Sequence, residues 1–127
     1  MIPEPKWITS DVLQLLHAQQ LERFGGLAGV LDANVVESGL ARPRNLYAYR
    51  DDVGLADLAA AYLCGLGQKQ GFVDGNKRTA LAAALVFLHV NASPLHVPPP
   101  ELYRLVMAVA TNQVADSAVA EFIRDHL

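Results

Sequence analysis

The sequence Phe72-Val73-Asp74-Gly75-Asn76-Lys77-Arg78-Thr79 joins two apolar segments of the chain. The segment before it, residues 55–66, is almost wholly apolar and rich in alanine, and so is the segment from Ala80 to Leu88. Segments that are apolar on nearly every face are typical of helices buried on most sides. We therefore predict a helix over residues 55–66 and a second over residues 76–90, the second being the central helix of the core.

The first turn of this second predicted helix carries Lys77 and Arg78, although the positive end of a helix dipole favours acidic residues there. The mismatch costs a few tenths of a kcal/mol to ~1 kcal/mol, and a bound anion would reverse it. Gly75 can adopt the backbone conformations of a concave nest of N–H groups, and Asn76 tolerates similar geometry while offering a side-chain amide. The sequence therefore predicts a phosphate cradle at this turn.

Asp74 stands beside the cradle, where a carboxylate could hold Mg²⁺ against phosphate oxygens. It could instead cap the helix, because Asp-Gly-Asn turns that cap helices are common. The residues alone leave a phosphate site and a structural loop both open. The spacing of Gly71 and Gly75 excludes a Walker-type loop, in which a four-residue gap separates the first glycine from a Gly-Lys pair.

A first helix is predicted near the start of the chain, where Thr9 or Ser10 can cap it and Gly25-Gly26 ends it. Its buried stripe at helical spacing consists of Leu13, Leu16, His17, Leu21 and Phe24.

A second helix follows Asp32, which can cap it, and should end near Ala41 because Pro43 disfavours helical geometry in the residue before it. Residues 43–54 alternate tyrosines with charged residues, a pattern equally compatible with a small hairpin and an irregular loop. We expect a flap-like segment there, with Tyr47 and Tyr49 either lining a docking surface or packing on the core.

Two more helices complete the predicted fold. One begins at Pro98-Pro99-Pro100, and the last is capped by Asp116 or Ser117. No repeat, low-complexity tract or long linker divides the 127 residues. The predicted fold is therefore all-α, a compact helical bundle around a central apolar helix, with residues 1–127 forming a single domain.

The composition restricts the partners and the compartment. The formal net charge of −3 argues against direct binding of nucleic acid by counterion release. Cys64 is the sole cysteine and lies in an apolar stretch, so we expect a buried free thiol and no disulfide. The N-terminus shows no signal-peptide pattern, and the longest apolar run is well short of the ~20 residues that span a bilayer. We expect a soluble, cytoplasmic protein without membrane contact.

Residues 72–80 resemble the core motif of the Fic/Doc family, whose general form is His-x-Phe-x-Asp/Glu-Gly-Asn-x-Arg. The segment Leu16–Leu21, followed by Phe24-Gly25-Gly26-Leu27, resembles the first helix and glycine stop of the Doc (death-on-curing) branch. The resemblance implies an all-helical domain in which Asp74 binds Mg²⁺. It also implies that phosphates are held by Gly75, Asn76, Lys77 and Arg78.

The resemblance further implies a toxin of a toxin–antitoxin pair, with a Phd-like antitoxin as partner. Doc-like proteins are expected to transfer a phosphoryl group from ATP or another nucleoside triphosphate to a hydroxyl of a translation elongation factor. Family members that transfer AMP usually carry a second Arg three positions after the first, where this chain has Leu81. The Doc branch is therefore favoured over a nucleotidyl (AMP) transferase, which is kept as an alternative.

The family's catalytic His corresponds to Gln70 in this chain. Imidazole serves there as a general base, and a carboxamide cannot, so we expect a rate lower by on the order of 10²- to 10⁴-fold. None of the four histidines, His17, His89, His96 and His126, is an obvious substitute, although His17 could approach the site through folding. A second reading is thus a catalytically inactive protein that binds nucleotide or antitoxin. The oligomeric state stays open.

Overall fold

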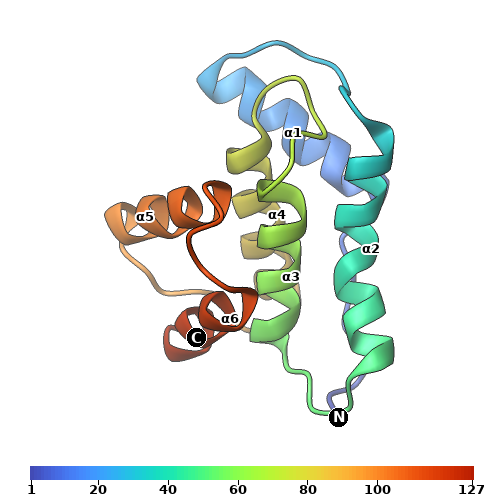
Figure 1. Cartoon of the computed structure of the whole chain (residues 1–127), viewed down its shortest axis with the longest axis vertical. Helices are drawn as coiled ribbons and strands as arrows, with labels where there is room; N and C mark the ends of the chain where they lie inside the picture. Colours follow the sequence, from blue (N-terminus) through green and yellow to red (C-terminus); the bar gives the residue numbers. More distant parts are fainter.

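The computed structural model describes all residues from 1 to 127 and contains six helices and no strand. In chain order these are α1 (Ser10–Phe24), α2 (Ala33–Tyr49), α3 (Leu55–Gly67), α4 (Asn76–Val90), α5 (Pro99–Ala110) and α6 (Asp116–Asp125) (Figure 1). The prediction of an all-helical fold is confirmed. No helix in the structure combines the length and the hydropathy that a membrane span requires.

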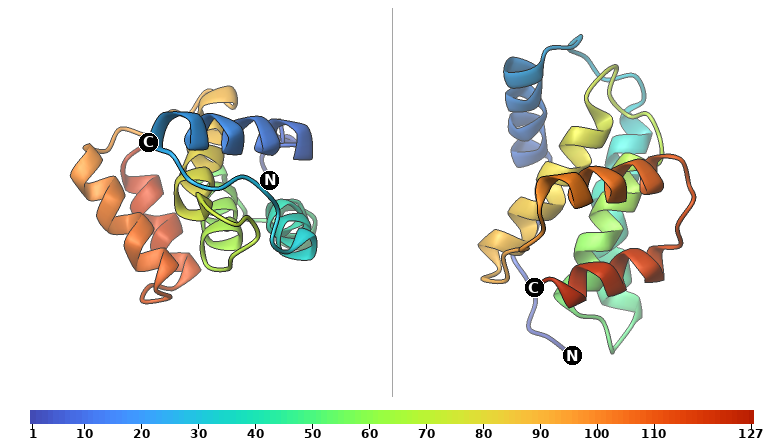
Figure 2. Two further views of the ribbon diagram at one scale, coloured as in Figure 1. Left: turned by 90° about the horizontal axis from the view of Figure 1, so that it is seen from above. Right: turned by 90° about the vertical axis from the view of Figure 1, so that its left-hand side faces the viewer.

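Helix α3 occupies the centre of the bundle, with α2 on one side and α5 and α6 on the other (Figures 1 and 2). Helix α4 packs against α3, and α1 packs across α4. The largest fully buried side chains of this pair are Leu58, Tyr62, Leu63, Phe87 and Leu88. The predicted central apolar helix therefore exists, but it is α3, because α4 keeps part of its surface towards solvent.

Helices α2 and α3 approach each other closely at two glycines, Gly39 and Gly65. A Cβ atom on Gly39 would lie 2.5 Å from Cδ2 of Leu66 and 3.0 Å from the carbonyl oxygen of Gly65. Real Cβ atoms do not approach other atoms this closely, so the absence of side chains sets the distance between the helices. The contact fixes α2 against the end of α3 from which the loop to α4 departs.

Hydrogen bonds and backbone angles at the helix ends confirm several of the predicted capping residues. Thr9 Oγ1 accepts from the backbone N–H of Val12 at 3.3 Å, and Asp32 Oδ1 accepts from that of Asn34 at 3.0 Å. Gly25 ends α1 with a φ of 79°, a conformation that side chains disfavour. These ends were predictable because the capping residue acts on its own neighbours.

Helix α2 does not end near Ala41 as predicted but continues through Pro43 to Tyr49. A proline inside a helix removes one N–H donor and crowds the carbonyl group four residues earlier, here that of Gly39, at a cost of about 3 kcal/mol. The side chain of Pro43 is fully buried in the core. Burial of the ring, together with the packing of the partly buried Leu46 and Tyr47 against the core, offsets the local penalty, so the prediction was wrong because tertiary packing overrides it.

The flap predicted over residues 43–54 is also wrong, because its first half belongs to α2. Tyr47 packs edge-on against Trp7 with ring centroids 5.7 Å apart, whereas Tyr49 is 88% exposed. The remaining loop lies at the opposite end of α3 from the loop that precedes α4 (Figure 1). Neither tyrosine therefore borders the predicted phosphate cradle.

The last helix is not capped by Asp116 or Ser117, since its N-cap residue is Ala115 and makes no side-chain bond. Asp116 is the first helical residue, and its carboxylate pairs with the guanidinium of Arg42 on α2. A negative charge in the first turn also suits the helix dipole. The carboxylate predicted to cap α6 thus links α6 to α2.

Candidate functional site

The loop of residues 68–75 leads from the central helix to the start of α4, and the side chain of Asn76 holds it together. Asn76 Oδ1 accepts from the backbone N–H groups of Gly71 at 3.1 Å and Phe72 at 2.9 Å. Its Nδ2 donates to the carbonyl oxygen of Phe72 at 2.8 Å. Because the amide is used within the loop, the group of Asn76 that can face an anion is its backbone N–H.

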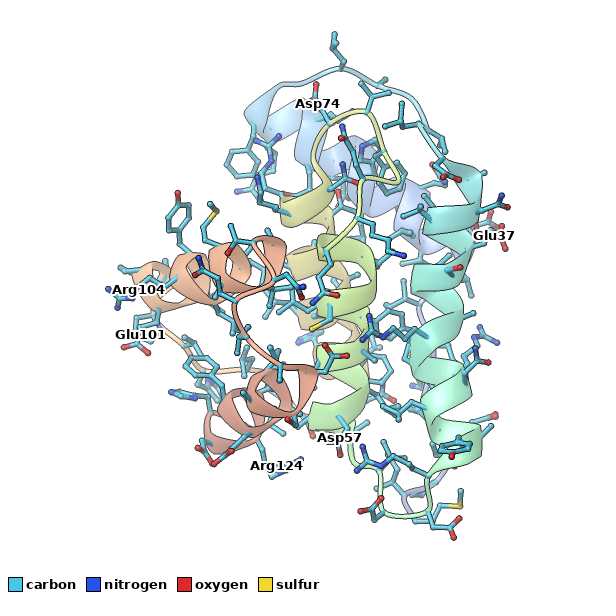
Figure 3. All side chains as sticks on the ribbon, viewed as in Figure 1. Glu37, Asp57, Asp74, Glu101, Arg104 and Arg124 are labelled. Atoms are coloured by element: carbon cyan, nitrogen blue, oxygen red, sulfur yellow. The ribbon has the colours of Figure 1, made fainter.

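The connection between α1 and α2 supports the same loop from the other side. Val30 and Phe72 form an antiparallel bridge, and the N–H of Val73 donates to the carbonyl oxygen of Gly29 at 3.0 Å. Figure 3 shows Asp74 at the tip of the loop, beside this connection. The α1–α2 connection, rather than the predicted flap, therefore borders the site.

Asp74 does not cap α4, because its Oδ2 accepts from the backbone N–H of Leu27 at 2.7 Å. The N-cap residue is Gly75, which has φ 79° and ψ 16°, a left-handed conformation that favours glycine. Oδ1 of Asp74 makes no hydrogen bond within the protein, so one carboxylate oxygen remains available to a cation.

Four unpaired backbone N–H groups at the start of α4 indicate an anion site. The first bond into the helix runs from the N–H of Thr79 to the carbonyl oxygen of Gly75 at 2.9 Å, and the N–H groups of residues 75–78 donate to no protein acceptor. Free donors at the positive end of a helix dipole attract phosphate or carboxylate groups. The predicted cradle thus has the donors it needs.

A cavity of about 790 Å³ lies over this helix start, within the size range of small-molecule sites. It is lined by all six residues predicted for the site: Gln70, Asp74, Gly75, Asn76, Lys77 and Arg78. Lys69 also lines it, so three cationic side chains face one carboxylate, in a chain of net charge −3. None of these three cations forms a salt bridge. The cavity is therefore an electropositive region on an acidic protein.

Arg78 is held in place by the end of α1. Its Nη2 donates to the carbonyl oxygen of Gly25 at 3.1 Å, and its guanidinium lies 5.1 Å from the centre of the Phe24 ring. A guanidinium has five N–H donors, so this contact leaves others free for a phosphate. Lys77 is exposed and has no such anchor.

Gln70 lies at the rim of the cavity and is exposed. Its Nε2 donates to the carbonyl oxygen of Val73 at 2.8 Å, across the loop. The remaining Oε1 can accept a hydrogen bond from a hydroxyl group, but a carboxamide oxygen does not take up the proton near neutral pH.

The sequence reasoning missed one feature of the site and left a second one open. Helix α5 forms an apolar wall of the cavity with Leu102, Tyr103, Val106 and Met107. The second feature is His17, which lies under the loop with Nε2 2.8 Å from the carbonyl oxygen of Asp74. The helical spacing placed His17 on the buried face of α1, but no local pattern indicated what it meets there.

The other candidate groups lie outside the site. His89 and His96 are exposed, and His126 Nδ1 lies 2.7 Å from the carbonyl oxygen of Phe122. Cys64 is buried as predicted, and burial, followed by the nearby Asp116 carboxylate, raises the pKa of its thiol to about 12. No group of three or more His, Cys, Asp and Glu side chains could by itself hold a metal ion.

Comparison with known proteins yields consistent similarities. A profile described as the Fic/DOC family matches residues 7–88. The chain is 35% identical over 117 residues to "Protein kinase doc" of Escherichia phage P1, and the alignment covers 92% of each chain. It is 44% identical over 73 residues to "Toxin Doc" of Mycolicibacterium smegmatis, covering 57% of this chain and 56% of that protein.

Proposed function

The chain belongs to the Fic/Doc family and is a homologue of Doc toxins, and from this premise we propose that it is a phosphoryl-transferring toxin. The donor is ATP or another nucleoside triphosphate, and the acceptor is a hydroxyl group of a translation elongation factor in the cytoplasm. A Phd-like antitoxin is its partner. The rate is expected to be low because Gln70 occupies the position of the general base.

The observation that carries this proposal is the electropositive cavity over the start of α4. A nucleoside triphosphate presents several negative charges, and the free N–H groups of residues 75–78 and the side chains of Lys77 and Arg78 offer complementary charge. Phosphoryl transfer depends mainly on positioning and charge neutralisation, which this cavity can supply without a covalent intermediate. The apolar wall on α5 leaves room for a nucleoside beside the phosphates.

The residues present fit a magnesium ion held jointly with phosphates. Mg²⁺ commonly takes one or two carboxylates together with phosphate oxygens and waters, and it offsets the charge that develops during transfer. Oδ1 of Asp74 is the carboxylate oxygen available beside the cradle, while Oδ2 is fixed by the Leu27 N–H. One carboxylate suits a shared ion better than a site built from protein groups alone.

In the proposed reaction the acceptor hydroxyl oxygen bonds to the terminal phosphorus of the donor. The bond from that phosphorus to the bridging oxygen breaks, and its electrons leave with the nucleoside diphosphate. The hydroxyl proton must pass to a base, which Gln70 cannot be. Gln70 Oε1 can orient the hydroxyl but does not take up its proton. The proton therefore leaves to water or to a phosphate oxygen, and the step is slow.

A second function is favoured by one specific observation, the bond from Gln70 Nε2 to the Val73 carbonyl oxygen. This contact gives Gln70 a role in bracing the loop that is independent of proton transfer. A protein that keeps the phosphate cradle and such a brace could bind nucleotide, or its antitoxin, without transferring a group.

Incubation of the purified protein and a translation extract with ATP labelled on the terminal or the α phosphate separates these readings. The Gln70→His variant is assayed in parallel, with Gln14→His as a matched control that adds a histidine on the exposed face of α1. Slow transfer of the terminal label by the parent, accelerated in Gln70→His alone, is expected. Transfer by the variant but not the parent supports the non-catalytic reading, and transfer of the α label identifies a nucleotidyl transferase.

A further inference from the structure

One side chain from α1, that of His17, contacts two residues of the turn that precedes α4 and lies beside a third. The ring of His17 stacks on that of Phe72, with centroids 3.8 Å apart and an interplanar angle of 14°. Its Nε2 lies 2.8 Å from the carbonyl oxygen of Asp74, and a Cβ atom on Gly75 would lie 3.6 Å from its Cδ2. His17 is buried, with 5% of its surface exposed.

The bond between His17 and Asp74 has a defined direction. A carbonyl oxygen only accepts, so Nε2 must carry the hydrogen and donate it. This nitrogen is therefore committed to the backbone and cannot also accept the proton of a substrate hydroxyl. His17 does not replace the general base missing at Gln70 through this atom.

Because the peptide bond is planar, the hydrogen bond from His17 to the Asp74 carbonyl oxygen also fixes the direction of the Gly75 N–H group. In a trans peptide the C=O and N–H groups point in opposite directions, and the chain contains no cis peptide. When the carbonyl oxygen of Asp74 is held towards His17, the N–H of Gly75 must therefore point away from it. That N–H is among the four that have no protein acceptor.

The opposite orientation of this peptide is accessible because rotating it takes φ of Gly75 from 79° to a negative value, which any residue can adopt. A rotated Asp74–Gly75 peptide would turn a carbonyl oxygen outward, and a carbonyl oxygen repels phosphate. The hydrogen bond from His17 opposes that rotation. It also polarises the peptide, which makes the Gly75 N–H a stronger donor.

We propose that His17 is a positioning residue that locks the Asp74–Gly75 peptide with its N–H directed at the bound phosphate. This assignment rests on the proposed function, since it presupposes that the turn binds phosphates. It separates two contributions of one side chain: the ring supports Phe72, and the Nε2–H orients the anion-binding backbone.

Two substitutions divide these contributions. His17→Phe keeps a ring to stack on Phe72 but has no donor, whereas His17→Gln retains an N–H donor near the position of Nε2. Inorganic tripolyphosphate and ATP serve as probes in calorimetric titrations, with His89→Phe as the matched control on the exposed end of α4. We expect about tenfold weaker binding of both probes by His17→Phe, the effect of one charge-assisted hydrogen bond, and binding within about threefold of the parent by His17→Gln.

A measurement on the parent protein keeps the test independent of whether the variants fold. Titration with tripolyphosphate should move the amide proton resonance of Gly75 downfield in a ¹⁵N-resolved NMR spectrum. Either of two results overturns the role of His17 but not the proposed function. One is binding of tripolyphosphate without a response at Gly75, and the other is a folded His17→Phe variant that binds as tightly as the parent. A parent that binds neither tripolyphosphate nor ATP overturns the proposed function itself.

Discussion

Arg78, in the first turn of α4, donates from Nη2 to the carbonyl oxygen of Gly25 at the end of α1, 3.1 Å away. The start of one helix, with its free N–H groups, is thereby tied to the end of another, with its free carbonyl groups. The guanidinium is also held over the Phe24 ring. Arg78 thus reaches the cavity as an anchored cation rather than as a mobile one.

Replacement of Arg78 should therefore affect nucleotide binding more than stability. Arg78→Ala is expected to weaken ATP binding about tenfold, because a charge-assisted bond to phosphate is lost. The free energy of unfolding should fall by about 1 kcal/mol or less, since the exposed contact to Gly25 contributes little. Titration calorimetry and urea denaturation measure the two effects.

Phe24→Ala, which removes the ring but no charge, serves as the control and should leave ATP affinity within about threefold. An equal loss of ATP affinity in both variants would contradict a direct role for Arg78.

Asp74→Asn should separate magnesium binding from phosphate binding. An asparagine oxygen can still accept from the Leu27 N–H, so the loop should keep its shape, but the negative charge that attracts Mg²⁺ is lost. We expect Mg²⁺ to increase the affinity of the parent for ATP and to have little effect on the variant. Titrations with ATP in magnesium and in EDTA provide the comparison. The same dependence on Mg²⁺ in both proteins would show that Asp74 is not the ligand.

The parts of this fold that were predictable from the sequence depend on neighbouring residues. Thr9 and Asp32 act on backbone groups two or three residues away, and Gly75 is required by its own φ angle. The predicted helix end before Pro43 was wrong because burial, which only the tertiary structure creates, outweighed the local preference against helix. His17 was placed on the right face of α1, but its contact with Asp74 joins residues 57 positions apart.

Gly71 should tolerate no side chain, because it packs against α2. A Cβ atom there would lie 2.7 Å from Cγ2 of Val36, and a methyl group must displace that side chain or the loop. Gly71→Ala is expected to lower the free energy of unfolding by about 1–3 kcal/mol, as for overpacking in a core. Gly67→Ala is the control, since its Cβ atom would make only ordinary contacts, the nearest at 3.4 Å.

Urea denaturation of both variants, and of Gly71→Ala combined with Val36→Ala, measures this effect. The shorter side chain at position 36 should restore part of the stability lost in Gly71→Ala. Equal stability of Gly71→Ala and Gly67→Ala would show that the loop can move away from α2 without penalty.

The thiol of Cys64 should be unreactive in the folded protein. Burial is the main cause that raises its pKa to about 12, so almost none of it is thiolate at neutral pH. An unfolded thiol has a pKa of ~8.5, so the folded state retains the proton more tightly. The contribution of this group to stability is therefore complete below pH ~8.5 and is lost as the pH rises towards about 12.

Two measurements follow for Cys64. Modification by a disulfide reagent at pH 7.5 should proceed no faster than unfolding, and Cys64→Ala should show a shallower decline of stability than the parent above pH ~9. Tyr62, whose pKa burial also raises, is common to both proteins and cancels in this comparison. Rapid modification of folded protein would mean that Cys64 is accessible.

The pH dependence of transfer should reveal whether proton removal limits the reaction. Gln70→His supplies a base with a pKa of ~6.5, which accepts a proton only when neutral, so the rate of the variant should rise with pH between about 5.5 and 7.5 and then level. Its maximal rate should exceed that of the parent by about 10²- to 10⁴-fold, the usual effect of a general base. The parent has no such group and should show no inflection in this range.

Single-turnover transfer of the terminal phosphate of ATP, measured from pH 5 to 9, gives both profiles. ATP affinity should be equal in the two proteins, because Gln70 braces the loop but is not part of the phosphate cradle; a variant with tighter ATP binding and an unchanged rate would assign position 70 to binding instead of proton transfer.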